Sequence, residues 1–171
     1  MASELGPIGG PGLSVLFVGI NPSLRSAEVG HHFARPGNRF WPTLFAAGFT
    51  PRRLSPEEDG LLPSFGVGVV NFVSRPTRSA VELTDAELRA GAAELERTVR
   101  AWAPRLVTVL GVVAYRTAFG RPDARLGLQD ESVGARPVWV LPNPSGLNAH
   151  YKSADFARLY EAARQYAASL E

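Results

Sequence analysis

Polar side chains that could do chemistry follow several apolar runs of this chain. Asn21 comes soon after the first run, Asn71 lies near the end of the second, and Asn143 and Ser145 follow the last. Amides and hydroxyls can position a water molecule and stabilise a leaving anion through directed hydrogen bonds, but they supply no strong general base. Such a set suits a reaction in which the substrate bond breaks largely by itself.

Two adjacent histidines, His31 and His32, lie in the segment after the first apolar run. They have no histidine partner at helical spacing, and the sequence nominates no carboxylates that would complete a metal site. The chain also contains no cysteine, no glycine-rich phosphate loop and no Gly-x-Ser-x-Gly nucleophile elbow. We therefore expect neither a metal nor a cofactor.

The elements that must position these residues are predicted from apolar periodicity. Four short apolar runs, typical of buried strands, alternate with amphipathic patterns, typical of helices. The strands are predicted at 13–18, 65–73, 106–110 and 138–141, and the helices at 38–47, 84–102, 112–119 and from 153 onwards. This alternation predicts an α/β fold with three layers, α/β/α, around a short, mostly parallel four-stranded sheet.

The loops between these elements carry most of the polar candidates. Right-handed crossovers place the loops after the first, second and fourth strands at one edge of the sheet, where ligands bind in α/β proteins. That edge gathers Asn21, His31, His32, Phe33, Asn71, Asn143, Ser145 and Asn148. The stretches 50–63 and 121–136 are expected to be surface connections, the former with about one helical turn.

Length and composition indicate one domain. The 171 residues, 45% hydrophobic and 20% charged, suit a globular domain over 13–171 after a loose, flexible lead-in over 1–12. No apolar run approaches the roughly 18 residues that a membrane span needs. The absence of cysteine fits an intracellular protein. All basic residues except Lys152 are arginines, which is compatible with phosphate contacts and equally with a solvated surface.

Several segments resemble the signature motifs of the mismatch-specific uracil/thymine-DNA glycosylases, within the uracil-DNA glycosylase superfamily. They are GINPS at 19–23, GHHF at 30–33, PGNRFW at 36–41 and LPNPSGL at 141–147. The likeness covers nearly the whole chain in the same order, including Asn71 and the segment 75–77. It implies a uracil-DNA glycosylase-like fold.

The resemblance implies a monofunctional DNA glycosylase that hydrolyses the N-glycosidic bond of uracil, with thymine as a second candidate, opposite guanine in double-stranded DNA. The base would be flipped out of the stack and an abasic site would remain, as in base excision repair. Asn21 would hold the attacking water, although an ordinary Asn-Pro turn would also explain this residue. Relatives with aspartate at that position are more active, so we expect slow turnover. Strand cleavage would need an amine nucleophile, and Lys152 is the only lysine.

The same resemblance implies which residues would contact the flipped base. Phe33 would stack on it, and the backbone N–H groups of Ile20 and Phe33 would bind its carbonyl edge. Asn71 would face the base, Ser26 would limit the space beside the C5 atom, and His32 would form part of the wall. Phe33 could equally be a core residue, and Asn71 could equally cap the strand end.

The motif at 141–147 would enter the minor groove. Leu147 would fill the space left by the extruded base. Backbone groups of Gly146 and Asn148 would face the widowed guanine, and Asn143 and Ser145 would touch phosphate or hold the loop. A Gly- and Pro-rich turn with one exposed leucine is the plainer explanation of this motif.

Two other functions fit the same residues. A hydrolase of small pyrimidine nucleosides would use the pocket without the leucine wedge, and a non-enzymatic module that binds mismatched or damaged DNA would need no carboxylate. For the glycosylase we expect a monomer that binds duplex DNA with G·U or G·T mismatches and no membrane. We expect it in the bacterial cytoplasm, associated with the nucleoid through its substrate.

Overall fold

A five-stranded sheet forms the centre of the computed structural model, which describes residues 5–170. Its strands are β1 (Val15–Gly19), β2 (Val67–Asn71), β3 (Leu106–Leu110), β4 (Gly127–Leu128) and β5 (Val138–Leu141). The order across the sheet is β2-β1-β3-β5-β4, with β4 antiparallel to β5 and the other pairs parallel. The predicted α/β fold is confirmed. The short strand β4 is additional, because two residues are too few to show a periodic pattern.

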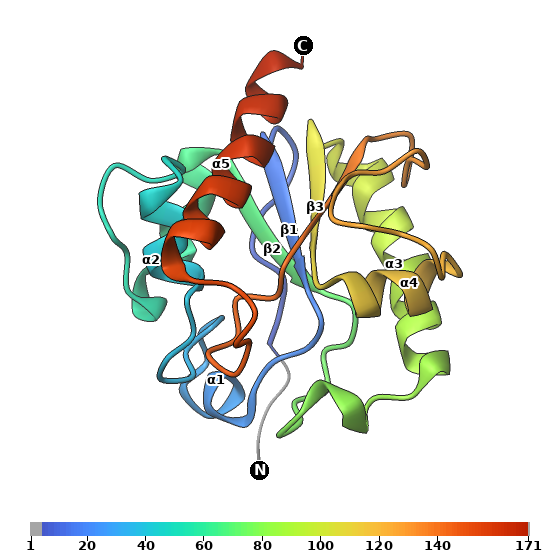
Figure 1. The fold of residues 1–171 in the computed structure, drawn as a ribbon, viewed down its shortest axis with the longest axis horizontal. Coiled ribbons are helices and arrows are strands. Elements are labelled where there is room, and N and C mark those ends of the chain that lie inside the picture. The colour runs from blue at the N-terminus through green and yellow to red at the C-terminus, as the bar shows by residue number, and fades with distance from the viewer. Residues whose placement is uncertain (1–4, 171) are drawn as a thin grey trace.

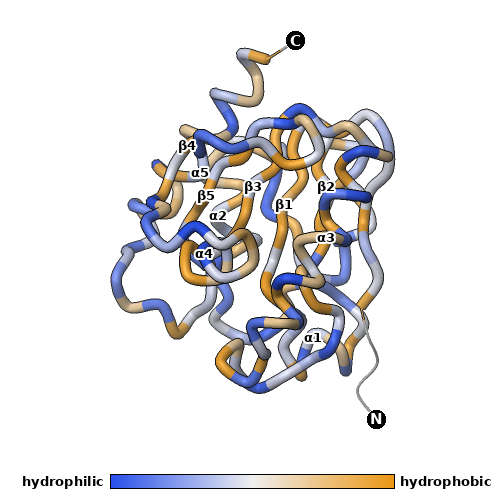
Figure 2. The backbone as a smooth tube through the Cα atoms, turned by 90° about the vertical axis from the view of Figure 1, so that its right-hand side faces the viewer, coloured by the Kyte–Doolittle hydropathy of each residue, from blue (hydrophilic) through white to orange (hydrophobic). Residues whose placement is uncertain are grey.

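Helices cover both faces of the sheet (Figure 1). One face packs against α2 (Phe40–Ala46), α5 (Ser153–Ser169) and the 3-10 helix η1 (Pro56–Phe65), and the other against α3 (Asp85–Trp102) and α4 (Val112–Phe119). Figure 2 shows the hydrophobic residues concentrated along the central strands. The predicted three-layer arrangement is therefore confirmed.

Three helical segments differ from the sequence prediction, and one of them is the short 3-10 helix η2 (Ala80–Glu82), which was not expected. The helix α1 (Leu24–Val29) lies where a continuous loop was expected, and η1 extends over ten residues where about one turn was expected. Ser23 caps α1 through its side chain, and Gly30 ends it with a positive φ of 77°. Helices this short lack the repeated apolar positions on which a periodicity argument depends.

The clearest predicted helix, α3, begins with the expected capping box. The Glu87 N–H donates to Thr84 Oγ1 at 3.1 Å, and the Thr84 N–H donates to Glu87 Oε1 at 3.0 Å. These reciprocal bonds satisfy two backbone donors that the first helical turn would otherwise leave unpaired.

The strand register brings the candidate residues to one edge. Gly19 at the end of β1 lies opposite Asn71 at the end of β2. The segments that follow β1, β2 and β5 gather at the lower end of the sheet in Figure 1. The predicted gathering of loops at one edge is therefore confirmed.

The described part of the lead-in is attached to the sheet. Ile8 and Val69 exchange two backbone hydrogen bonds of 2.8 Å in an antiparallel bridge along β2. Residues 5–12 thus run along the sheet edge instead of hanging free, and residues 1–4 of the expected lead-in lie outside the described residues. Within residues 5–170, no helix is both long and apolar enough to span a membrane.

Candidate active site

A cavity of about 230 Å³ opens at the carboxyl edge of the sheet. Most of the predicted site residues line it: Ile20, Asn21, Ser26, His32, Phe33, Asn71, Asn143, Ser145 and Leu147. Three predicted neighbours, His31, Gly146 and Asn148, lie outside its lining. The tertiary structure therefore joins segments that are more than a hundred residues apart in the sequence.

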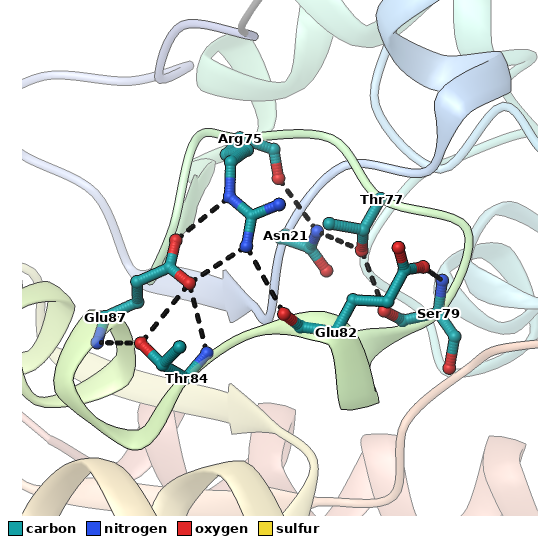
Figure 3. A network of polar contacts seen from close by, with 7 residues as sticks. All are labelled: Asn21, Arg75, Thr77, Ser79, Glu82, Thr84 and Glu87. Atoms are coloured by element: carbon teal, nitrogen blue, oxygen red, sulfur yellow. Dashed lines mark hydrogen bonds and ion pairs between the residues drawn. The ribbon is translucent and has the colours of Figure 1, made fainter.

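The Asn21 side chain is held in one orientation. Its Nδ2 donates hydrogen bonds of 2.8 Å to the backbone oxygen of Arg75 and to Oγ1 of Thr77. Because a backbone carbonyl can only accept, the amide nitrogen must face Arg75. The Oδ1 atom points away from the Arg75 carbonyl (Figure 3) and accepts no hydrogen bond within residues 5–170. It can therefore accept a hydrogen bond from a water molecule in the cavity.

The turn that holds Asn21 is itself attached to α3. The Arg75 guanidinium donates to both carboxylate oxygens of Glu87, at 3.0 and 2.9 Å (Figure 3). These hydrogen bonds, together with the one from the Thr84 N–H, lower the pKa of Glu87 to about 2. Glu87 therefore stays ionised at any working pH, and the helix N-terminus positions the carbonyl that orients Asn21.

The Phe33 ring forms an aromatic wall of the cavity. It stacks on Phe40 with 4.0 Å between ring centroids and 22° between ring planes. Phe33 has a φ of 53°, a left-handed conformation that costs a non-glycine residue free energy and is often found at functional sites. Within residues 5–170, the N–H groups of Ile20 and Phe33 donate no hydrogen bond, so both are free to bind a ligand oxygen.

Asn71 presents an unused amide to the cavity. Its side chain passes directly over Gly19, where a Cβ atom would lie only 2.5 Å from Asn71 Oδ1. A side chain at position 19 would therefore displace the Asn71 amide from this place. The Asn71 amide has no hydrogen-bond partner in the part of the chain that the structure describes, which leaves both its donor and its acceptor for a ligand.

His32 is fixed by contacts on three sides. The ring Nε2 lies 2.8 Å from the Gly6 carbonyl oxygen. The backbone N–H of His32 donates to Asp59 Oδ2 at 3.0 Å, and its backbone carbonyl accepts from Trp41 Nε1 at 3.2 Å. Burial lowers the pKa of His32, and this effect outweighs the raising effects of the Gly6 carbonyl and Asp59. The imidazole is therefore neutral at pH 7, with the proton on Nε2.

Asp59 is a site residue that sequence reasoning missed. It lies in the stretch expected to be a surface connection, yet its side chain is 10% exposed. One carboxylate oxygen accepts from His32, and the other lies 3.2 Å from His31 Nδ1, which draws His31 away from the cavity. No signal in the sequence distinguishes Asp59 from the neighbouring Glu57 and Glu58.

Ser26 connects α1 to the loop that carries Phe33. The residue is 2% exposed, and its Oγ accepts hydrogen bonds from the Ala34 N–H at 2.9 Å and from Ser23 Oγ at 3.1 Å. Its hydroxyl oxygen is thus engaged as an acceptor within the protein, and the side chain contributes bulk to the cavity wall.

The loop after β5 is held by its own polar side chains. Asn143 Oδ1 accepts from the Ser145 N–H at 3.0 Å, Ser145 Oγ accepts from the Leu147 N–H at 3.2 Å, and Asn148 Nδ2 donates to the Asn143 carbonyl at 3.1 Å. Leu147 is 71% exposed at the tip. Asn143 and Ser145 were expected to touch phosphate or to hold the loop, and these hydrogen bonds hold the loop.

Comparison with known families decides where this site belongs. A family model described as the uracil DNA glycosylase superfamily matches residues 7–164. The chain belongs to the uracil DNA glycosylase superfamily. Its fold is similar to that of a solution NMR structure from Methanosarcina acetivorans, provisionally identified as a uracil DNA glycosylase, with a TM-score of 0.53 and 17% sequence identity. The match covers 93% of this chain and 98% of that chain.

Membership of the uracil DNA glycosylase superfamily supports DNA glycosylase activity for this chain, that is, a hydrolase that acts on DNA in DNA repair. The charge of the cavity is consistent with such a polyanionic substrate. Among residues 5–170, its lining contains two arginines, Arg35 and Arg78, and no aspartate or glutamate. Within residues 5–170, no group of three His, Cys, Asp or Glu side chains is arranged to hold a metal ion.

Proposed function

We propose that this member of the superfamily is a monofunctional glycosylase that removes uracil mispaired with guanine from double-stranded DNA. The single observation that carries the proposal is the fixed Asn21 amide, which lines the cavity and whose Oδ1 accepts no hydrogen bond from residues 5–170. The same cavity has a stacking ring and two N–H groups that are unpaired within these residues. This arrangement can position a water molecule beside a base that has been flipped out of the duplex.

The proposed reaction is a hydrolysis in which bond breaking runs ahead of bond making. The bond between the sugar C1′ and the base N1 breaks, and the base departs as an anion. The free N–H groups of Ile20 and Phe33 would stabilise the charge on its carbonyl oxygens. The water held by Asn21 then bonds to C1′ and releases its proton to solvent, because an amide cannot act as a strong base.

The cavity wall favours uracil over thymine in this proposal. The buried Ser26 side chain occupies the position expected beside the C5 atom, where thymine carries a methyl group. Discrimination based on one methyl group is worth only about 1–3 kcal/mol. We therefore propose a preference for G·U with residual activity on G·T.

Base release in single-turnover reactions tests the proposal. Matched duplexes with G·U, G·T and A·U pairs, and single-stranded DNA with uracil, are compared for wild type and Asn21→Ala. Loss of a group that positions or stabilises the reacting atoms costs about 10²- to 10³-fold in rate, and we expect that loss on G·U. Gln165→Ala removes an exposed amide on α5 and is the matched control, expected to react like wild type.

Two further measurements, of mismatch binding and of release from free deoxyuridine, separate the competing functions. Mismatch binding without base release from any DNA would indicate a damage-binding module. Release from free deoxyuridine as fast as from duplex DNA would indicate a nucleoside hydrolase. Lys152 lies at the N-cap position of α5 and does not line the cavity, so we expect abasic product without strand cleavage unless alkali is added.

A further inference from the structure

Arg39 connects the two loops of the site. Its backbone N–H donates to the Pro144 carbonyl at 2.8 Å. Its guanidinium donates from Nη1 to the Tyr151 carbonyl at 2.8 Å, and from Nη2 to the carbonyls of Ser145, at 3.0 Å, and Asn148. All four acceptors belong to the loop between β5 and α5, which follows Arg39 by more than a hundred positions in the sequence.

The Arg39 charge is compensated without a carboxylate. Within residues 5–170, Arg39 forms no ion pair, and its Nε is buried without a hydrogen-bond partner. The guanidinium carbon lies 4.2 Å from the centroid of the Phe156 ring, a favourable cation–π distance. The charged guanidinium thus contacts backbone carbonyls and one aromatic face. Hydrogen bonds from a charged donor are stronger than those from a neutral donor, so these contacts hold the loop firmly.

The positions of the bonded carbonyls decide what this contact does. Ser145 and Asn148 flank the loop tip, where Leu147 is 71% exposed. The loop also sits directly on the segment before Arg39, because a Cβ on Gly146 would lie 2.6 Å from the Gly37 oxygen. The residues on both sides of Leu147 are therefore held by Arg39 and by the segment before it, while the Leu147 side chain is exposed to solvent.

We propose that Arg39 is a positioning residue for base extrusion, because it holds Leu147 at a fixed place relative to the cavity that receives the base. The inference rests on the proposed function. The next residue, Phe40, stacks on Phe33 at 4.0 Å, so adjacent residues place the wedge and the stacking wall. A loop already ordered in the free protein does not lose that conformational freedom on binding DNA.

The test compares uracil in three duplexes, opposite guanine, opposite adenine and opposite an abasic site. Extrusion costs least in the last, where uracil has no partner. We expect Arg39→Gln to slow single-turnover release of paired uracil by roughly tenfold or more, and of unpaired uracil by less than about threefold. Arg39→Lys keeps the charge without the planar fork and should change the rates in the same direction.

The matched control is Arg116→Gln. Arg116 Nε also donates to a loop carbonyl, that of Ala124, at 2.8 Å, but neither residue lines the cavity. We expect this variant to retain wild-type rates on all three duplexes. All rates are compared below the melting temperature of the least stable variant, so that a loss of fold is not mistaken for a loss of positioning.

A double-mutant cycle with Leu147→Ala completes the test. Without the leucine, Arg39→Gln should have little further effect on paired uracil. The fluorescence of 2-aminopurine beside the uracil reports unstacking without chemistry, and its rise should be smaller in Arg39→Gln. Equal slowing on all three duplexes, or additive effects with Leu147→Ala, would overturn the inference. Absence of uracil release by wild type would instead overturn the proposed function.

Discussion

At the scale of single residues, the site depends on an amide whose orientation its neighbours dictate. Asn21 donates to the Arg75 carbonyl and to Thr77, and these contacts leave its oxygen for a water molecule. A carboxylate at this position would place a second acceptor against the Arg75 carbonyl oxygen. The local geometry therefore favours an amide over a carboxylate at position 21, because the amide nitrogen can donate to the Arg75 carbonyl and a carboxylate oxygen cannot.

The Thr77 hydroxyl provides a graded test of this orientation. Thr77→Val keeps the side-chain volume of a residue that is 5% exposed, but it removes one of the two acceptors of Asn21 Nδ2. A hydrogen bond contributes about 0.5–1.5 kcal/mol, so we expect base release to slow by roughly 2- to 13-fold. Thr77→Ser retains the hydroxyl and should stay close to wild type. A Thr77→Val enzyme as fast as wild type would show that the Arg75 carbonyl alone orients the amide.

His32 should make stability depend on pH in a defined direction. Burial lowers its pKa in the folded state below the ordinary value of 6.5, so the unfolded chain binds the proton more readily. Stability therefore falls as the pH drops through 6.5 toward the lowered pKa, and it is greatest above that range. Urea unfolding at pH 7.5 and 5.5 measures the effect.

His32→Gln is the comparison protein, since it lacks the titrating group but keeps Asp59 and His31 beside the site. Wild type should lose more free energy of unfolding than this variant between the two pH values. Equal losses in both proteins would show that His32 takes up a proton as readily when folded as when unfolded.

At the scale of secondary-structure elements, α3 determines how closely the second strand approaches its covering helix. Gly91 packs on the backbone just after β2, and a Cβ at this position would lie 2.2 Å from the Phe72 oxygen. Helix propensity alone would favour alanine by about 1 kcal/mol. The contact reverses that preference, because a backbone oxygen cannot move aside as the end of a flexible side chain can.

A matched pair of substitutions separates propensity from packing. Gly91→Ala should destabilise the protein by about 1–3 kcal/mol, because the overpacked helix must shift. Ala90→Gly, at the exposed neighbouring position of the same helix, should cost about 1 kcal/mol from propensity alone. Urea or thermal unfolding measures both. A stabilised Gly91→Ala protein would contradict the close approach of α3 to Phe72.

At the scale of the whole molecule, charge is distributed unevenly although the net charge is only +2. In the part of the chain that the structure describes, the cavity lining contains Arg35 and Arg78 and no acidic residue. Both arginines are exposed, and neither forms an ion pair within residues 5–170. A polyanion approaching the cavity therefore meets two guanidinium groups that need not break other contacts first.

Salt dependence of DNA binding tests the role of these arginines. Each phosphate contact contributes about 0.9 to the slope of log K against log salt concentration, so Arg35→Gln and Arg78→Gln should each lower the slope by about that amount. Arg105→Gln is the control, since this exposed arginine precedes β3 at the opposite edge of the sheet. Unchanged slopes in the first two variants would place the DNA backbone elsewhere.

Much of the fold follows from local patterns that the sequence contains. The bounds of β3, α4 and β5 agree with the apolar runs at 106–110, 112–119 and 138–141. The chemical types at the site also follow from the sequence, since amides and an aromatic ring come directly after strands. Strand periodicity and helix caps act over a few residues, which is why the sequence alone determined these features.

Only the tertiary structure decided how the site groups are oriented. The direction of the Asn21 amide depends on a carbonyl 54 positions away, and the placement of His32 depends on Asp59, 27 positions away. The support of the Leu147 loop depends on Arg39, more than a hundred positions away. Such contacts arise from strand register and helix packing, and neither leaves a local pattern in the sequence. The sequence by itself therefore determined the elements and the chemistry they carry, and packing decided which atom faces the substrate.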